Sequence, residues 1–319
     1  MKHTDLLKHA YQITVRYRVL WLFGILLALT SGSGGNVPQW RTGGRRGADL
    51  PIPGLDRLGL GHVDWQALAP IIVAGCCVLF ILTIISIIVN YVARVALYRS
   101  VDQIEATASA PTWREGVRLG WSNRTFRLFL LDLIVWLPFA IVALLLLALG
   151  AAPLLLLLID DPVAKALGVA ATVGLEIVII VALIVVGVIL GVFGQFWSRE
   201  IGLADRSIGQ ALATGYALAR RRLKDVTVLW LLLFALGLGY GLVFLVILVV
   251  VLILAAAVGG GIGLAIHALT GSVGWAVAVG LPFFLVILLV PTVFIQGLWL
   301  VFESTAWTLA YREVASAKG

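Results

Sequence analysis

The chain has 319 residues, of which 61% are hydrophobic and only 12% are charged, and its net charge is +7. A soluble domain of this length carries about twice that charged fraction. The composition therefore excludes an ordinary soluble protein and indicates a polytopic α-helical membrane protein. It also excludes a β-barrel, because the sequence lacks short segments of alternating hydrophobicity.

The first hydrophobic run in chain order, Val19–Leu29, is only eleven residues long. Three interpretations of this run stay open. It spans the membrane by recruiting Ala10–Tyr17, with Arg16 and Arg18 reaching the inner surface; it is a re-entrant helix; or it is a signal peptide that is cleaved. The Gly- and Pro-rich stretch that follows, residues 41–59, is interpreted as a flexible linker.

Five longer hydrophobic runs follow, so the sequence predicts about six spans. These runs are Pro70–Val89, Phe126–Ile159, Ala166–Ser198, Val226–Ala257 and Ser272–Phe302. Most of them exceed the roughly 20 residues that one crossing needs. Candidate break points are Pro138, Pro153, Pro282 and Pro291, and we expect the "GGGIG" at 259–263 to break a helix at its outer end.

The positive charges predict the orientation. With a cytoplasmic N-terminus, 18 of the 23 Lys and Arg residues fall on the inner segments, which are 1–18, 91–127, 198–225 and 303–319. Short cytoplasmic loops of membrane proteins carry such an excess of basic residues. We therefore expect a protein of the inner or plasma membrane with both termini in the cytoplasm. Its basic face is expected to hold anionic lipid head groups. Nucleic-acid binding is not expected, because no recognition module accompanies these charges.

Two stretches that precede pairs of spans have a common pattern, "TWREGVRLGWSNR" at 112–124 and "SIGQALATGYALAR" at 207–220. Each opens with a hydroxyl residue and has Glu or Gln three positions later, which predicts a capping box at a helix N-terminus. Each also has a small residue eight positions after the hydroxyl residue and an aromatic residue directly after that. These pairs are Gly120-Trp121 and Gly215-Tyr216, and the N-terminal Ala10-Tyr11 is a looser copy.

We interpret these stretches as amphipathic helices that lie in the inner membrane interface. The alternative is that each is an ordinary solvated loop helix. In the interfacial interpretation, the residues expected to contact anionic lipid or the interface are Arg114, Arg118, Arg124, Arg127, Arg220, Arg221 and Arg222.

Each stretch is followed by two spans, so the 1–319 chain is predicted to be one membrane domain with an internal repeat. The expected units cover about residues 1–99, 100–199 and 200–319. Each unit holds an even number of spans, so the three units are expected to be parallel, unlike the inverted repeats of many transporters.

Three segments carry a family resemblance: "YVARVALYRSVDQIEA" (91–106), "SREIGLADRSIGQALATGYALARRR" (198–222) and "FESTAWTLAYRE" (302–313). In layout and in these weak motifs, the chain resembles bacterial and archaeal multi-pass proteins similar to the membrane domain of some glycerophosphoryl diester phosphodiesterases. In such proteins the phosphodiesterase chemistry belongs to a separate soluble barrel. This chain departs from the family by lacking such a barrel, so the resemblance implies a stand-alone membrane module whose activity is mostly undefined.

Asp132 and Glu176 are the carboxylates inside the hydrophobic runs, and intramembrane acids are candidate functional residues. We expect Asp132 to pair with an inner arginine and Glu176 to reach water near the outer boundary, too far apart to share a site. A proton or cation relay is the alternative. The glycine pairs Gly187/Gly191 and Gly237/Gly241 have GxxxG spacing, so we expect the two spans that carry them to pack through these faces.

No nucleophile, acid–base pair or metal-ligand spacing is recognisable in the sequence. We therefore expect no catalytic residues, no metal and no cofactor. The sequence favours a non-enzymatic scaffold or a lipid-associated accessory subunit, with a membrane protein partner or a second copy as possible associates. The alternative function is a transporter or channel subunit that uses Asp132 or Glu176 along a path.

Overall fold

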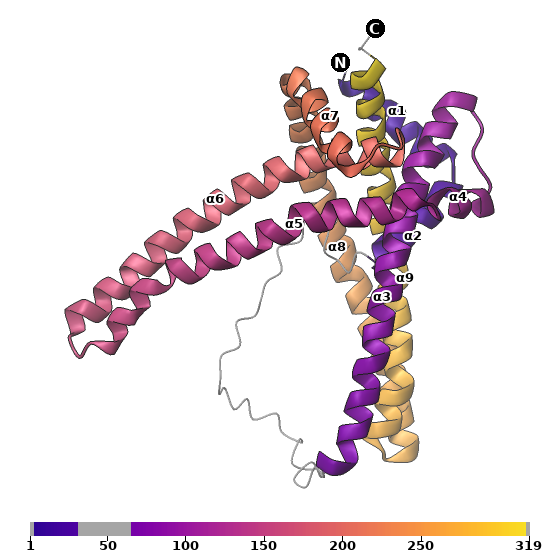
Figure 1. Cartoon of the computed structure of the whole chain (residues 1–319). Helices are drawn as coiled ribbons and strands as arrows, with labels where there is room; N and C mark the ends of the chain where they lie inside the picture. Colours follow the sequence, from indigo (N-terminus) through magenta and orange to yellow (C-terminus); the bar gives the residue numbers. More distant parts are fainter. Residues whose placement is uncertain (1–2, 31–64, 317–319) are drawn as a thin grey trace.

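A computed structural model describes residues 3–30 and 65–316, and this part of the chain forms nine α-helices and one 3₁₀ helix without any strand (Figure 1). Five of the helices are long and apolar enough to cross a membrane, and a bent pair at the N-terminal end would make a sixth span. The predicted all-α polytopic membrane fold is thus confirmed. The Gly- and Pro-rich stretch at 41–59 lies outside the described residues.

A short helix followed by two apolar helices occurs three times in the chain. The first set is α1 (His3–Arg16), α2 (Val19–Thr30) and α3 (Trp65–Thr107). The second is α4 (Trp113–Gly120), α5 (Asn123–Gly150) and α6 (Pro162–Gly202), with the 3₁₀ helix η3 (Ala152–Leu158) before α6. The third is α7 (Ile208–Arg221), α8 (Leu223–Thr270) and α9 (Val273–Ser316).

The long helices continue well past the ends of the hydrophobic runs. The longest, α8, has 48 residues, which at 1.5 Å per residue is about 72 Å, or more than twice a bilayer core. It includes the "GGGIG" at 259–263, so the expected helix break there is wrong; α8 ends instead at Gly271, whose φ is +66°. Of the candidate break points, Pro138, Pro282 and Pro291 lie inside continuous helices, and only Pro153 lies where a long helix ends.

The N-terminal pair, α1 and α2, is bent by 96°. Residues 10–17 therefore do not extend α2 into one straight span, and the pair is either a broken span or a re-entrant segment. Helix α2 is part of the packed core, because Leu20 and Phe23 are buried and Gly24 lies directly against Gly297 of α9.

Each short helix packs on the end of a long helix. Helix α1 packs on α9, α4 on α3 and α7 on α6. Ala10, Gly120 and Gly215 are all buried in these contacts. A Cβ atom at Gly215 would lie 2.6 Å from Cδ1 of Trp197, so only a residue without a side chain fits there. We call the end of the molecule where α1, α4, α7 and both described termini gather the base.

Two helix hairpins diverge from the base (Figure 1). Helices α5 and α6 form one arm, and α8 and α9 form the other, on which α2 and α3 pack. The arms expose apolar side chains along their length. In the most hydrophobic 18-residue window of α6, no residue is buried inside the protein, and in the corresponding windows of α8 and α9 only 11% of the residues are buried. Surfaces of this kind require lipid or a membrane partner around them.

The glycine pairs do not join the arms as the sequence predicted. A Cβ atom at Gly191 or Gly241 would meet no atom within 4 Å, and one at Gly187 would meet only Phe139 of α5, at 3.7 Å. Gly237 lies near Trp299 of α9. The expected packing of α6 on α8 is therefore wrong, because the two helices belong to diverging arms.

Candidate functional site: a cleft between the arms

A cleft with a volume of about 1700 Å³ lies between the two arms and is lined by residues of α2, α3, α5, α6, α8 and α9. Its walls are mostly apolar and rich in aromatic side chains, while α3, α5, α6, α8 and α9 each contribute polar residues to the lining. These polar lining residues include Tyr91, Arg94, Asp132, Gln195, Ser198, Gln296 and Glu303. The cleft therefore combines a polar region with long apolar walls, as an amphiphilic ligand requires.

Helices α3 and α5 contribute a compact polar cluster to the cleft. Asp132 accepts a hydrogen bond from the Tyr91 hydroxyl at 3.0 Å and forms an ion pair with Arg94 at 3.2 Å. The Tyr91 ring packs edge-on against Phe129, and the Arg94 guanidinium lies 5.5 Å from the Tyr91 ring centroid. The expected pairing of Asp132 with an arginine is confirmed, and its partner lies 38 residues earlier in the chain.

Glu176 lies far from this cluster. Its carboxylate is close to Gly150, where a Cβ atom would lie 2.7 Å from Oε1 of Glu176. Gly150 ends α5, 18 residues and about 27 Å of helix after Asp132. The two acids therefore occupy opposite ends of the α5–α6 arm, and Glu176 does not line the cleft.

Arg199 is buried behind the α6 wall of the cleft, with only 1% of its surface exposed. It donates to Thr308, to the Ser304 carbonyl and to both oxygens of Gln195, and its guanidinium lies 4.6 Å from the Tyr98 ring centroid. All these partners are neutral, so they satisfy the donors of Arg199 without neutralising its charge.

The next residue, Glu200, is equally buried but faces other partners. Its carboxylate accepts from Nε of Arg206 at 2.9 Å, from the Tyr311 hydroxyl at 3.1 Å and from the Thr214 hydroxyl at 3.2 Å. These contacts tie the end of α6 to α7 and α9, which fixes the base from which the arms diverge.

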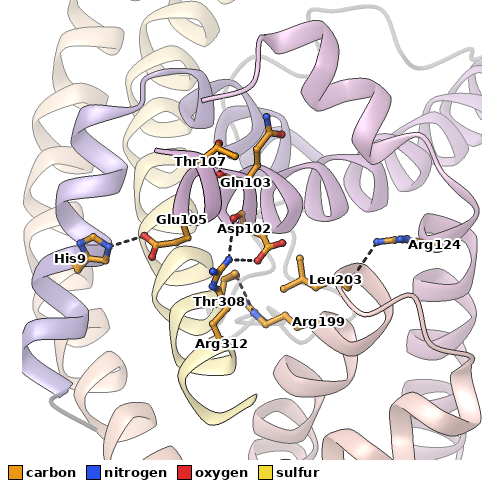
Figure 2. A network of polar contacts seen from close by, with 10 residues as sticks. All are labelled: His9, Asp102, Gln103, Glu105, Thr107, Arg124, Arg199, Leu203, Thr308 and Arg312. Carbon is orange, nitrogen blue, oxygen red and sulfur yellow. Dashed lines mark hydrogen bonds and ion pairs between the residues drawn. The ribbon is translucent and has the colours of Figure 1, made fainter. Parts of the chain in front are cut away.

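Further polar contacts join the helix ends at the base (Figure 2). Arg312 of α9 binds the carboxylate and the carbonyl of Asp102 in α3, and His9 of α1 lies 2.7 Å from Glu105 in α3. Arg124 of α5 donates to the carbonyls of Gly202, the last residue of α6, and of Leu203, which follows it. The three segments that carry the family resemblance thus meet at the base.

The basic residues predicted to contact lipid separate into two groups. Arg124 and Arg127 form ion pairs with Asp205, and Arg222 forms one with Asp225. These three side chains are therefore occupied within the protein. The other four, Arg114, Arg118, Arg220 and Arg221, lie on exposed positions of α4 and α7.

The apolar sides of α4 and α7 face different surroundings. Trp113 and Trp121, on α4 and at its end, are 55% and 70% exposed, while Gly116 and Gly120 are buried against α2 and α3. In α7, Ala211, Gly215 and Ala219 are buried by the rest of the protein. The apolar face that we expected to lie in the membrane is thus largely covered by protein in α7.

The expected capping box of α4 is present. The Thr112 backbone N–H donates to the Glu115 carboxylate at 2.8 Å, and the Glu115 N–H donates to the Thr112 hydroxyl at 3.4 Å. The first of these bonds favours the ionised form and lowers the pKa of Glu115. The matching residue of α7, Gln210, accepts from the Ser207 N–H at 3.3 Å.

Sequence reasoning missed Glu303, Arg94 and Gln195 as lining residues. It ended the last hydrophobic run at Phe302 and counted the charges beyond it as cytoplasmic. One signal was available: Gln296, Trp299, Glu303 and Trp307 recur at offsets of 0, 3, 7 and 11, which places them on one face of a continuous helix. All four line the cleft.

Within residues 3–30 and 65–316, His, Cys, Asp and Glu side chains form no group of three or more that could hold a metal ion. One family model matches residues 10–307, and it describes a family of unknown function (DUF7544). No curated protein and no solved structure matches the chain. The resemblance to the membrane domain of glycerophosphoryl diester phosphodiesterases stays a prediction.

Proposed function

We propose that this chain, which belongs to DUF7544, a family of unknown function, holds membrane lipid in the cleft between its arms and acts as a non-enzymatic scaffold or accessory subunit. The observation that carries this proposal is the cleft of about 1700 Å³ with long apolar walls and polar side chains among its lining. Pockets for small ligands usually have volumes of about 300–1000 Å³. A larger cleft in a membrane protein suits a molecule with acyl chains.

The surface of α4 supports lipid contact at a second place. Trp113 and Trp121 are exposed beside Arg114 and Arg118, and the Arg114 guanidinium lies 5.7 Å from the Trp113 ring. Tryptophans concentrate at membrane interfaces, and basic residues next to them attract anionic head groups. We infer that α4 lies in the inner interface of the plasma membrane, which places the base and both termini in the cytoplasm.

We also infer that the three sets of helices are a parallel repeat. The support is the shared way in which α1, α4 and α7 pack: Ala10, Gly120 and Gly215 are buried, whereas the aromatic residue after each is exposed. In a repeat related by a three-fold axis, α2 would meet α9, α5 would meet α3 and α8 would meet α6. The first two contacts are formed, and the cleft occupies the place of the third.

A transporter is the second candidate. The observation in its favour is that Asp132 and Glu303 both line the cleft. It ranks second because Asp132 is already bound to Arg94 and Tyr91, and a carboxylate held in this way is less free to bind and release a cation.

The lipid proposal is tested by filling the cleft. Gly241 lines the cleft, whereas Gly239 lies outside the lining on the same helix, and a Cβ atom at either glycine would meet no other atom within 4 Å. We expect Gly241→Trp to lose most of the lipid that co-purifies with the full chain, measured as lipid adducts by native mass spectrometry. Gly239→Trp is the matched control and should keep the wild-type amount. Equal lipid retention by both variants would contradict the proposal.

A further inference from the structure

Glu303 is an acid in the cleft that lacks a direct partner. It lies on α9 in the cleft lining and is partly buried. Among the residues that the structure describes, no donor hydrogen-bonds to its carboxylate and no basic group lies within 4 Å of it. The neighbouring acids differ: Asp132 is bound by Arg94 and Glu200 by Arg206. A shielded carboxylate without a partner is costly.

Arg199 does not supply the missing contact. It acts on Glu303 electrostatically, but its donors are directed to Gln195, the Ser304 carbonyl and Thr308. The carboxylate of Glu303 thus keeps its acceptor capacity for a group that enters the cleft.

Aromatic side chains surround the position of Glu303. Trp299 and Trp307 lie one helical turn to either side of it on the same face of α9. Trp307 is only 3% exposed and packs against Phe196, so Trp299 is the ring that a ligand in the cleft can reach. On the facing helix, Tyr240 stacks on Trp299 with ring centroids 4.6 Å apart. The Tyr240 hydroxyl is buried and has no hydrogen-bond partner among the described residues. Tryptophan faces attract cations, and an adjacent carboxylate adds to that attraction.

We propose that Glu303 and Trp299 bind the ammonium group of a membrane lipid whose acyl chains fill the cleft. This inference rests on the proposed function and names the head group. The ammonium group of ethanolamine offers three N–H donors to the carboxylate, and that of choline offers a cation to the Trp299 ring. The cleft is far larger than a free metal ion or small cation requires, and its apolar walls match lipid chains.

The test measures head-group selectivity by native mass spectrometry of the full chain in detergent. The protein is offered equal amounts of phosphatidylethanolamine, phosphatidylcholine and phosphatidylglycerol. We expect the wild type to retain the two ammonium lipids over phosphatidylglycerol. Glu303→Gln should lower that ratio about tenfold, as expected for the loss of a hydrogen bond between charged groups. Glu313→Gln, at an exposed position of the same helix, is the matched control and should keep the ratio.

A second variant keeps the inference testable if Glu303→Gln does not fold, which its thermal unfolding in detergent would show. Trp299→Leu removes a cation-attracting ring but leaves the carboxylate, and it should lower the ratio about threefold. The inference is overturned if the wild type binds all three lipids equally, or if neither variant changes the ratio.

The remaining outcomes distinguish failure of this inference from failure of the proposed function. They also distinguish lipid binding from the binding of a free cation. If wild-type protein retains lipid without head-group preference, the inference fails while the proposed function stands. If Gly241→Trp retains as much lipid as the wild type, the proposed function fails as well. Tetraphenylphosphonium tests a free organic cation: if its binding requires Glu303 while lipid selectivity does not, the site takes a small cation and the lipid inference is wrong.

Discussion

At the scale of single residues, the adjacent charges Arg199 and Glu200 show how the base is held together. Both are 1% exposed, yet they do not pair with each other. Arg199 binds neutral acceptors of α6 and α9, whereas Glu200 binds Arg206, Thr214 and Tyr311. Because a buried carboxylate is stable only while its partners remain, Glu200 couples the fold of α6 to that of α7 and α9.

We predict that Glu200→Ala strongly lowers the thermal unfolding midpoint of the purified protein in detergent. Removing the carboxylate leaves the buried Tyr311 hydroxyl without its acceptor, which costs about 1–3 kcal/mol. The ion pair with Arg206 adds less, because the Arg206 side chain is 35% exposed. Asp160→Ala is the control: Asp160 pairs with Lys165 at 3.3 Å but is fully exposed, so its loss should not shift the midpoint measurably. Similar midpoints for the two variants would refute this role of Glu200.

At the scale of helices, glycines allow close packing only where two helices belong to the same part of the molecule. A Cβ atom at Gly280 of α9 would lie 2.6 Å from the carbonyl oxygen of Gly259 in α8, and one at Gly297 would lie 2.8 Å from the Ile25 nitrogen in α2. Gly191 forms a GxxxG pair with Gly187 in the sequence but faces the open cleft. Spacing alone therefore does not identify a packing face.

We predict opposite effects of leucine at these two kinds of glycine. Gly297→Leu should destabilise the protein by at least about 1–3 kcal/mol, because the side chain would collide with the α2 backbone. Gly191→Leu should leave the thermal midpoint in detergent unchanged, because nothing lies within 4 Å of its Cβ position. A clear loss of stability in Gly191→Leu would mean that α6 and α8 do pack together, as the sequence pattern predicted.

At the scale of the whole molecule, the two arms diverge from one base, and this shape creates the cleft (Figure 1). The base is joined by polar contacts between helix ends, whereas the arms expose apolar surface along their length. A bilayer accommodates both arms if each is tilted, since their helices are longer than one crossing needs.

Cysteine labelling in membranes tests this arrangement on a background in which Cys76 and Cys77 are replaced by Ser. We expect Arg118→Cys and Arg220→Cys, both at the base, to react only with an impermeant reagent on the cytoplasmic side. Asp160→Cys and Thr270→Cys lie at the tips of the two arms and should react only from the outer side. Labelling of positions 118 and 220 from opposite sides, or of position 160 from the cytoplasm, would exclude the proposed topology.

The sequence by itself determined the class of the protein and much of its local structure. Uncharged runs longer than a bilayer core require membrane helices, and the Thr112/Glu115 pair fixes the start of α4, because hydrophobicity and capping act within a few turns. The sequence also indicated that Asp132 needs an arginine. Only the tertiary structure decided that Arg94 is that arginine, that Gly191 faces a cleft, and that Glu303 lies inside it. These outcomes depend on which helices meet, and helices with similar apolar surfaces do not encode their partners in their own periodicity.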